Sequence, residues 1–131
     1  MTELLHLENY SFTYPQQRRP ALSHVTLTVP EGAFMMLCGP SGCGKSTAGR
    51  TILGLTPATE GQVLIDGVDV CTATGDAMHT LRKKMQIIFQ DPYSSINPRL
   101  TVAEIIAEPM IVSGKFHSHK EIMERIPKLM D

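Results

Sequence analysis

The sequence predicts an α/β fold built around a phosphate-binding loop, and three adjacent observations support this prediction. Residues Gly39–Thr47 fit the pattern G-x-x-x-x-G-K-[S/T] of loops that hold nucleotide phosphates. The apolar run Ala33–Cys38 before the loop is typical of a buried strand. The apolar spacing over Lys45–Leu55 predicts a helix that ends near Gly54. Strand, glycine-rich loop and helix thus follow one another in the order that phosphate binding requires.

The residue types of this loop are those that hold a phosphate. Glycines allow successive backbone N–H groups to point at phosphate oxygens. Lys45 adds a positive charge near the β- and γ-phosphates, and the Ser46 hydroxyl can ligate Mg²⁺. The helix dipole favours the same anion. The predicted nucleotide-binding residues of the loop are Gly39, Ser41, Gly42, Cys43, Gly44, Lys45, Ser46 and Thr47.

Composition limits the other classes of function. The chain has 131 residues, a net charge of −1 and a pI near 6.5, which give no electrostatic reason to expect binding to nucleic acid or a membrane surface. No apolar run reaches the length of a membrane span, and the first residues do not resemble a signal peptide. The three cysteines follow no metal-ligand spacing, as expected in a reduced, cytoplasmic protein.

Two strands are predicted before the buried strand at Ala33–Cys38. Apolar residues nearly alternate over Leu4–Tyr14 with one offset, which predicts a strand with a bulge. Strict alternation over Val25–Val29 predicts a strand with one buried face. We expect these two strands to be antiparallel.

The elements after the loop follow from short local signals. Val63–Ile65 is predicted to be a strand that ends in the turn dipeptide Asp66-Gly67. We expect a helix over Gly75–Lys84 and a buried strand over Met85–Phe89. Thr101 and Glu104 predict a capping box for a helix through Ala107, which Pro109 bends or ends. Ser118 and Glu121 predict the same device for a final helix.

Tyr14, the phosphate loop and Gln90 together resemble the ATP-binding subunit of an ABC transporter. The run Gln86–Val102 is very similar to the branch that imports oligopeptides, dipeptides and nickel, and Gly49–Leu55 agrees with it. Phe12–Pro15 and Leu37–Lys45 are more similar to the ATPases of energy-coupling-factor importers. A mosaic gene and ordinary divergence within one branch both explain this difference.

The resemblance implies a P-loop NTPase fold of the ABC type, of which the chain holds the N-terminal part. We expect an antiparallel β-subdomain with part of the phosphate-loop core over about 1–90, and the start of a helical subdomain over about 91–131. Strands around Met35 and Ile87 would be the central ones.

The same resemblance implies cofactors, site roles and partners. Tyr14 is expected to stack on the adenine of ATP, while Ser46 and Gln90 hold Mg²⁺. Gln90 would also reach the attacking water and couple the site to the membrane subunits. The implied partners are membrane permease subunits and a second ATP-binding subunit, at the cytoplasmic face of the membrane.

Several family motifs do not occur in these 131 residues: the Leu-Ser-Gly-Gly-Gln signature, the second Mg²⁺-binding Asp, the catalytic Glu and the switch His. We therefore expect nucleotide binding without turnover by this chain alone. Central strands without neighbours also predict marginal stability or aggregation. The alternative function is a non-enzymatic remnant of a truncated or recombined transporter gene. Peptides, nickel, other chelated metals and vitamins remain open as transported solutes.

Overall fold

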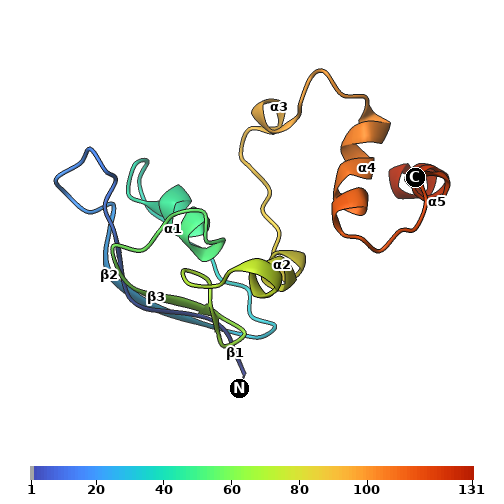
Figure 1. The fold of residues 1–131 in the computed structure, drawn as a ribbon. Helices are drawn as coiled ribbons and strands as arrows, with labels where there is room; N and C mark the ends of the chain where they lie inside the picture. The colour runs from blue at the N-terminus through green and yellow to red at the C-terminus, as the bar shows by residue number, and fades with distance from the viewer. Residues whose placement is uncertain (1) are drawn as a thin grey trace. The chain divides into compact units, whose positions relative to one another are not determined.

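An antiparallel sheet with the strand order β2-β1-β3-β4 organises the first part of the chain (Figure 1). The computed structural model describes residues 2–131, which divide into two units between Gln86 and Ile87. The first unit holds β1 (Glu3–Phe12), β2 (Leu22–Pro30), α1 (Lys45–Ile52), β3 (Glu60–Ile65), β4 (Val68–Asp69) and α2 (Gly75–Lys84). The second unit holds α3 (Pro92–Ser95), α4 (Val102–Val112) and α5 (His119–Met130).

β1 is the strand on which the sheet is built, because it pairs antiparallel with both β2 and β3. Leu7 lies opposite Leu27 on one side and Val63 on the other. The register shifts between Leu7 and Tyr10, where Asn9 has a positive φ of 47°. The predicted antiparallel pair and its bulge are therefore confirmed.

The turn between β3 and β4 follows directly from its residues. Asp66 and Gly67 have φ values of 52° and 77°, and two successive positive φ values are what a tight hairpin of matching twist needs. Lys84 at the end of α2 makes an ion pair with Asp66, with 2.6 Å between Nζ and Oδ2. The hairpin is thereby tied to the helix that follows it.

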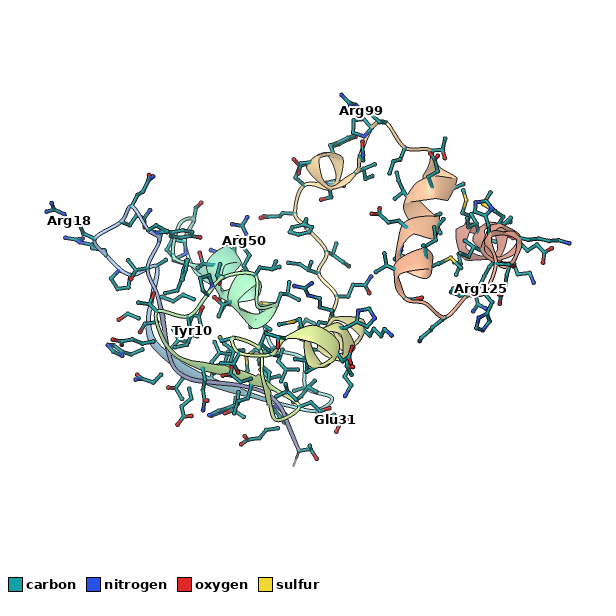
Figure 2. The ribbon with its side chains drawn as sticks, in the orientation of Figure 1. Tyr10, Arg18, Glu31, Arg50, Arg99 and Arg125 are labelled. Atoms are coloured by element: carbon teal, nitrogen blue, oxygen red, sulfur yellow. The ribbon has the colours of Figure 1, made fainter. Side chains whose placement is uncertain are left out.

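The core of the first unit lies between the sheet and its two helices, α1 and α2 (Figure 1). Tyr10 is fully buried there, and Figure 2 shows it beneath α1. Its hydroxyl accepts a hydrogen bond from Thr51 of α1 at 3.3 Å. The buried residues of this cluster are Leu7, Tyr10, Phe12, Val63, Ile65, Val70 and Leu81.

The prediction of strands at Ala33–Cys38 and Met85–Phe89 was wrong for this structure. Neither segment forms a strand among the described residues, and both carry exposed apolar side chains, including Phe34 and Ile88. A strand is defined by ladder hydrogen bonds to a neighbour, and the apolar sequence alone does not provide one. Both segments have the composition of central strands without the pairing.

The second unit packs α4 against α5 through a small apolar cluster of Ala107, Met110, Ile122 and Ile126. The capping box at Thr101 and Glu104 is confirmed, and Ser118 caps α5 by accepting from the Glu121 N–H at 3.2 Å. Pro109 does not end α4 at Ala107, because the helix continues to Val112 with the proline inside it.

Replacing Thr101 with alanine is expected to destabilise α4 by about 1 kcal/mol, the usual cost of losing an N-cap. Hydrogen bonds from the Thr101 N–H and hydroxyl hold the pKa of Glu104 below its ordinary value. A lowered carboxylate pKa in the folded state contributes stability that is present above the ordinary pKa and is lost as pH falls through the folded value. Alanine keeps the backbone N–H and removes the hydroxyl, so carboxyl NMR titration will show the pKa of Glu104 rising part of the way to its ordinary value in Thr101→Ala; no rise would contradict the hydrogen bond from the Thr101 hydroxyl.

Candidate phosphate-binding site

The loop between Gly39 and Thr47 curls because two of its glycines adopt conformations that other residues avoid. Gly42 and Gly44 have φ values of 80° and 102°. The Cys43 N–H donates to the Pro40 carbonyl at 3.3 Å, which closes the turn. Gly44 is the N-cap of α1 and makes no side-chain capping bond, so the N–H groups of the first turn are left for an anion.

Lys45 folds its ammonium group back onto this loop. Its Nζ donates to the carbonyls of Gly39 and Pro40 at 2.6 Å and 2.8 Å. The Sγ atom of Cys43 lies 3.5 Å from the same Nζ. The positive charge is thus held against the loop by two carbonyl acceptors, and the phosphate oxygens of a bound nucleotide can take their place as acceptors.

Gly39 and the Cys43 side chain face each other across the loop, so a side chain at Gly39 would displace the Cys43 thiol. A Cβ added there would lie 2.5 Å from the Cys43 Sγ, which is closer than real Cβ atoms approach, so the thiol would have to move. Gly44 is also confined, since a Cβ there would lie 3.0 Å from the Ala21 carbonyl oxygen. Gly44 is therefore favoured by its contacts as well as by its positive φ, whereas Gly39 is favoured by its contact with the thiol alone.

The closeness of Gly39 and Cys43 predicts that a substitution at Cys43 will compensate for one at Gly39. Gly39→Ala is expected to weaken binding of a fluorescent ATP analogue by roughly tenfold, a penalty of about 1.4 kcal/mol. Cys43→Ala alone removes only the Sγ atom and should bind nearly as well as the unmodified chain. The double variant Gly39→Ala/Cys43→Ala should recover most of the loss. Equal losses in the single and double variants would show that steric conflict with the thiol is not the cause.

Tyr14 is connected to the loop through Thr47. Its hydroxyl lies 3.1 Å from the Thr47 Oγ1, and its ring packs edge-on against Phe12 with centroids 4.8 Å apart. Thr47 is buried, so its side chain serves this contact, and a phosphate contact by Thr47 remains a prediction. The Tyr14–Thr47 contact and the Thr51–Tyr10 hydrogen bond together hold α1 against β1 and against the residues that follow β1.

Sequence reasoning did not find this pair of hydroxyl contacts. The available signal was a matching interval: the tyrosines at Tyr10 and Tyr14 and the threonines at Thr47 and Thr51 are both four residues apart. An interval of four places two side chains on one face of a helix, so Thr47 and Thr51 both face the sheet.

Ser46 and Gln90, the predicted Mg²⁺ ligands, lie in different units of the structure. Ser46 is exposed in the first turn of α1, and none of the hydrogen bonds described for residues 2–131 involves its hydroxyl. Gln90 is exposed in the second unit. A hydroxyl free for coordination fits the preference of Mg²⁺ for oxygen ligands, and the joint site remains a prediction.

Comparison with known proteins places this loop in a family. The family described as ABC transporter matches residues 22–130, which include all of Gly39–Thr47. The chain belongs to the ABC transporter family. Its relatives in that family include the oligopeptide transport ATP-binding protein OppF of Bacillus subtilis, which is 39% identical over 132 residues. OppF of Escherichia coli is 41% identical over 119 residues.

The matches to this ABC transporter family cover nearly all of the chain but only part of each relative. The alignments take in 100% and 91% of this chain and 43% and 36% of the two OppF proteins. A solved ATP-binding cassette, MJ0796 in a dimeric post-hydrolysis state with ADP and Pi, has a TM-score of 0.76 at 31% identity. That match covers 95% of this chain and 54% of the cassette. The chain therefore spans less than half of the curated relatives and about half of the cassette.

The ABC cassette fold is thus confirmed, in the partial form that the sequence predicts. Among the residues that the structure describes, no helix has the length and apolar character needed to cross a membrane.

Proposed function

We propose that this chain is the phosphate-binding part of an ATP-binding subunit that drives an ABC importer of peptides. The conformation of Gly39–Thr47, with the Lys45 ammonium held on the loop, is the observation that carries the proposal. A curled glycine-rich backbone, a lysine and a helix N-terminus form a site for the phosphates of a nucleotide. The OppF relatives, named as oligopeptide transport proteins, support peptides as the solute.

Each site residue has a defined task in this proposal. The loop N–H groups and Lys45 hold the phosphates of ATP, and Tyr14 stacks on the adenine ring. Ser46 and Gln90 hold Mg²⁺, which neutralises charge on the phosphates. Tyr14 is suited to its task because the Thr47 hydroxyl fixes the end of its ring next to the loop. The family residues that polarise water do not occur in this sequence, so turnover by this chain alone is not expected.

The proposed partners are membrane permease subunits and a second ATP-binding subunit, at the cytoplasmic face of the membrane. The dimeric state of the MJ0796 cassette supports the second subunit. Nickel import remains a prediction from the sequence resemblance. The OppF match over the whole chain supports ordinary divergence within the peptide branch over a mosaic gene.

A non-enzymatic remnant of a transporter gene is the second candidate function. The exposed apolar segments at Phe34 and Ile88 favour it, because unpaired core segments weaken a fold. A titration with a fluorescent ATP analogue separates the two candidates. Saturable binding that depends on Lys45 supports the first, and no binding by a folded chain supports the second.

The role of Tyr14 is tested by comparing two ligands. Tyr14→Ala is expected to weaken ATP binding by roughly tenfold, because stacking of a base on an aromatic ring contributes about 1–3 kcal/mol. Binding of inorganic tripolyphosphate, which has no base, should change little. Tyr14→Phe keeps the ring and should retain most of the ATP affinity. An equal loss for both ligands in Tyr14→Ala would show that Tyr14 shapes the loop and does not bind the base.

A further inference from the structure

The buried hydroxyl of Thr47 links the phosphate-binding loop to the aromatic residue proposed for the base. Thr47 lies in the first turn of α1, directly after Ser46, and is only 8% exposed. Its Oγ1 lies 3.1 Å from the hydroxyl oxygen of Tyr14, which comes from the segment that follows β1. The contact joins residues 33 positions apart in the chain. One threonine therefore belongs to the loop and also contacts the residue that would stack on a base.

The Tyr14 side chain is held at two points, of which only one is directional. Its ring packs edge-on against Phe12, with 4.8 Å between the ring centroids. Phe12 is itself buried at the end of β1, so it limits how far the Tyr14 ring can shift. The aromatic contact offers nothing to the hydroxyl, whose partner is Thr47. The position of the far end of the ring therefore depends on Thr47.

The hydroxyl pair responds differently to the loss of each partner. Removal of the Thr47 hydroxyl leaves the part-buried Tyr14 hydroxyl without this hydrogen bond, which costs free energy until the group turns towards water. The ring then moves together with its hydroxyl. Removal of the Tyr14 hydroxyl is milder, because a threonine in a helix can donate to a backbone carbonyl three or four residues before it. The ring is thus disturbed more by a change at Thr47 than by loss of its own hydroxyl.

We propose that Thr47 is a specificity-determining residue: through Tyr14, its hydroxyl makes the site select polyphosphates that carry a base over polyphosphates that do not. A ring already held in the binding position gives affinity without the cost of ordering it. The contact holds the ring at a fixed place relative to the phosphates, because Thr47 is in the helix that begins at the loop. A ligand without a base gains nothing from this. The inference rests on the proposed function, in which Tyr14 stacks on the base.

The test measures one ratio on the full 131-residue chain, the affinity for ATP divided by the affinity for inorganic tripolyphosphate. Both ligands carry the same number of phosphates, so a phosphate contact made by Thr47 cancels in the ratio. Thr47→Val keeps the shape of the side chain without the hydroxyl and is expected to lower the ratio by about fivefold. The double variant Tyr14→Phe/Thr47→Val has no hydroxyl to satisfy and should return the ratio to within about twofold of the original.

Thr51→Val is the matched control, because Thr51 lies one turn further along the same helix and is fully buried. Its hydroxyl bonds to Tyr10 and Thr56, at 3.3 Å and 3.0 Å. Thr51→Val is expected to lower the midpoint of urea unfolding and to leave the ratio unchanged. A purely structural role of Thr47 would give Thr47→Val the same result. Should Thr47→Val fail to fold, Thr47→Ala takes its place with the same expected outcome.

Three results would overturn the inference. The first is an unchanged ratio in Thr47→Val while Tyr14→Ala lowers the ratio, which leaves the proposed stacking intact and removes Thr47 from it. The second is a lowered ratio in Thr47→Val that the added Tyr14→Phe does not restore, because the effect would then not pass through the hydroxyl pair. The third is an unchanged ratio in Tyr14→Ala itself, which contradicts the proposed base contact and the inference with it.

Discussion

Replacing Lys45 with alanine is expected to weaken ATP binding by roughly 10- to 100-fold. The Nζ donors now occupied by the Gly39 and Pro40 carbonyls become charge-assisted hydrogen bonds to phosphate when ATP binds. Hydrogen bonds to charged groups contribute about 1.5–3 kcal/mol, which corresponds to that range of affinity. The measurement is a fluorescence titration with a labelled ATP analogue, followed by displacement with unlabelled ATP.

Lys83→Ala is the matched control, because it removes the same charge from an exposed position at the end of α2. The affinity of Lys83→Ala should equal that of the unmodified chain at moderate salt, where distant charges are screened. If both variants lose affinity equally, the attraction is a general charge effect and the loop does not bind the phosphates.

Replacing Tyr10 with alanine is expected to destabilise the first unit by about 3–5 kcal/mol, the usual cost of truncating a buried aromatic residue. Tyr10 is fully buried beneath α1, and its loss also leaves the Thr51 hydroxyl without one of its partners. The free energy of unfolding of a small domain is only about 5–15 kcal/mol, so this loss is a large part of the stability of the first unit. Urea unfolding followed by far-ultraviolet circular dichroism measures the change.

Two further variants assign the cause of that loss. Tyr10→Phe removes only the hydroxyl and should cost about 1 kcal/mol. Tyr93→Ala removes a tyrosine that is 90% exposed and should change stability by no more than about 0.5 kcal/mol. A small effect of Tyr10→Ala, similar to that of Tyr93→Ala, would contradict the core described for the first unit.

Elements with local signals were predicted correctly from the sequence. The helix Gly75–Lys84, the turn at Asp66-Gly67 and the capping box at Thr101 each depend on residues close together in the chain. Capping, turn chemistry and helical spacing act over one or two turns, so a short window contains the whole cause. The predicted end of the helix near Pro109 was wrong, because the helix accommodates the proline and is held by its packing against α5.

In the candidate site, too, the features with local causes were predicted from the sequence and the contacts between distant residues were not. The pattern Gly39–Thr47 was sufficient to predict a curled loop with Lys45 and Ser46 at the start of a helix. The contact of Gly39 with Cys43 and the bond of Tyr14 to Thr47 could not be predicted, because they join side chains through the folded path of the chain. The contribution of Gln90 remains a prediction.

By itself, the sequence determined that this protein has a curled glycine-rich loop before a helix and strand-forming segments of the ABC type. Those properties reside in single residues: glycine permits positive φ, lysine supplies charge, and an apolar run favours burial. Only the tertiary structure decided which apolar runs become strands. The run predicted over Leu4–Tyr14 forms β1 (Glu3–Phe12), which finds partners in β2 and β3, whereas Ala33–Cys38 finds none among the described residues. A strand needs hydrogen bonds from a neighbour, and a neighbour is a property of the assembled sheet.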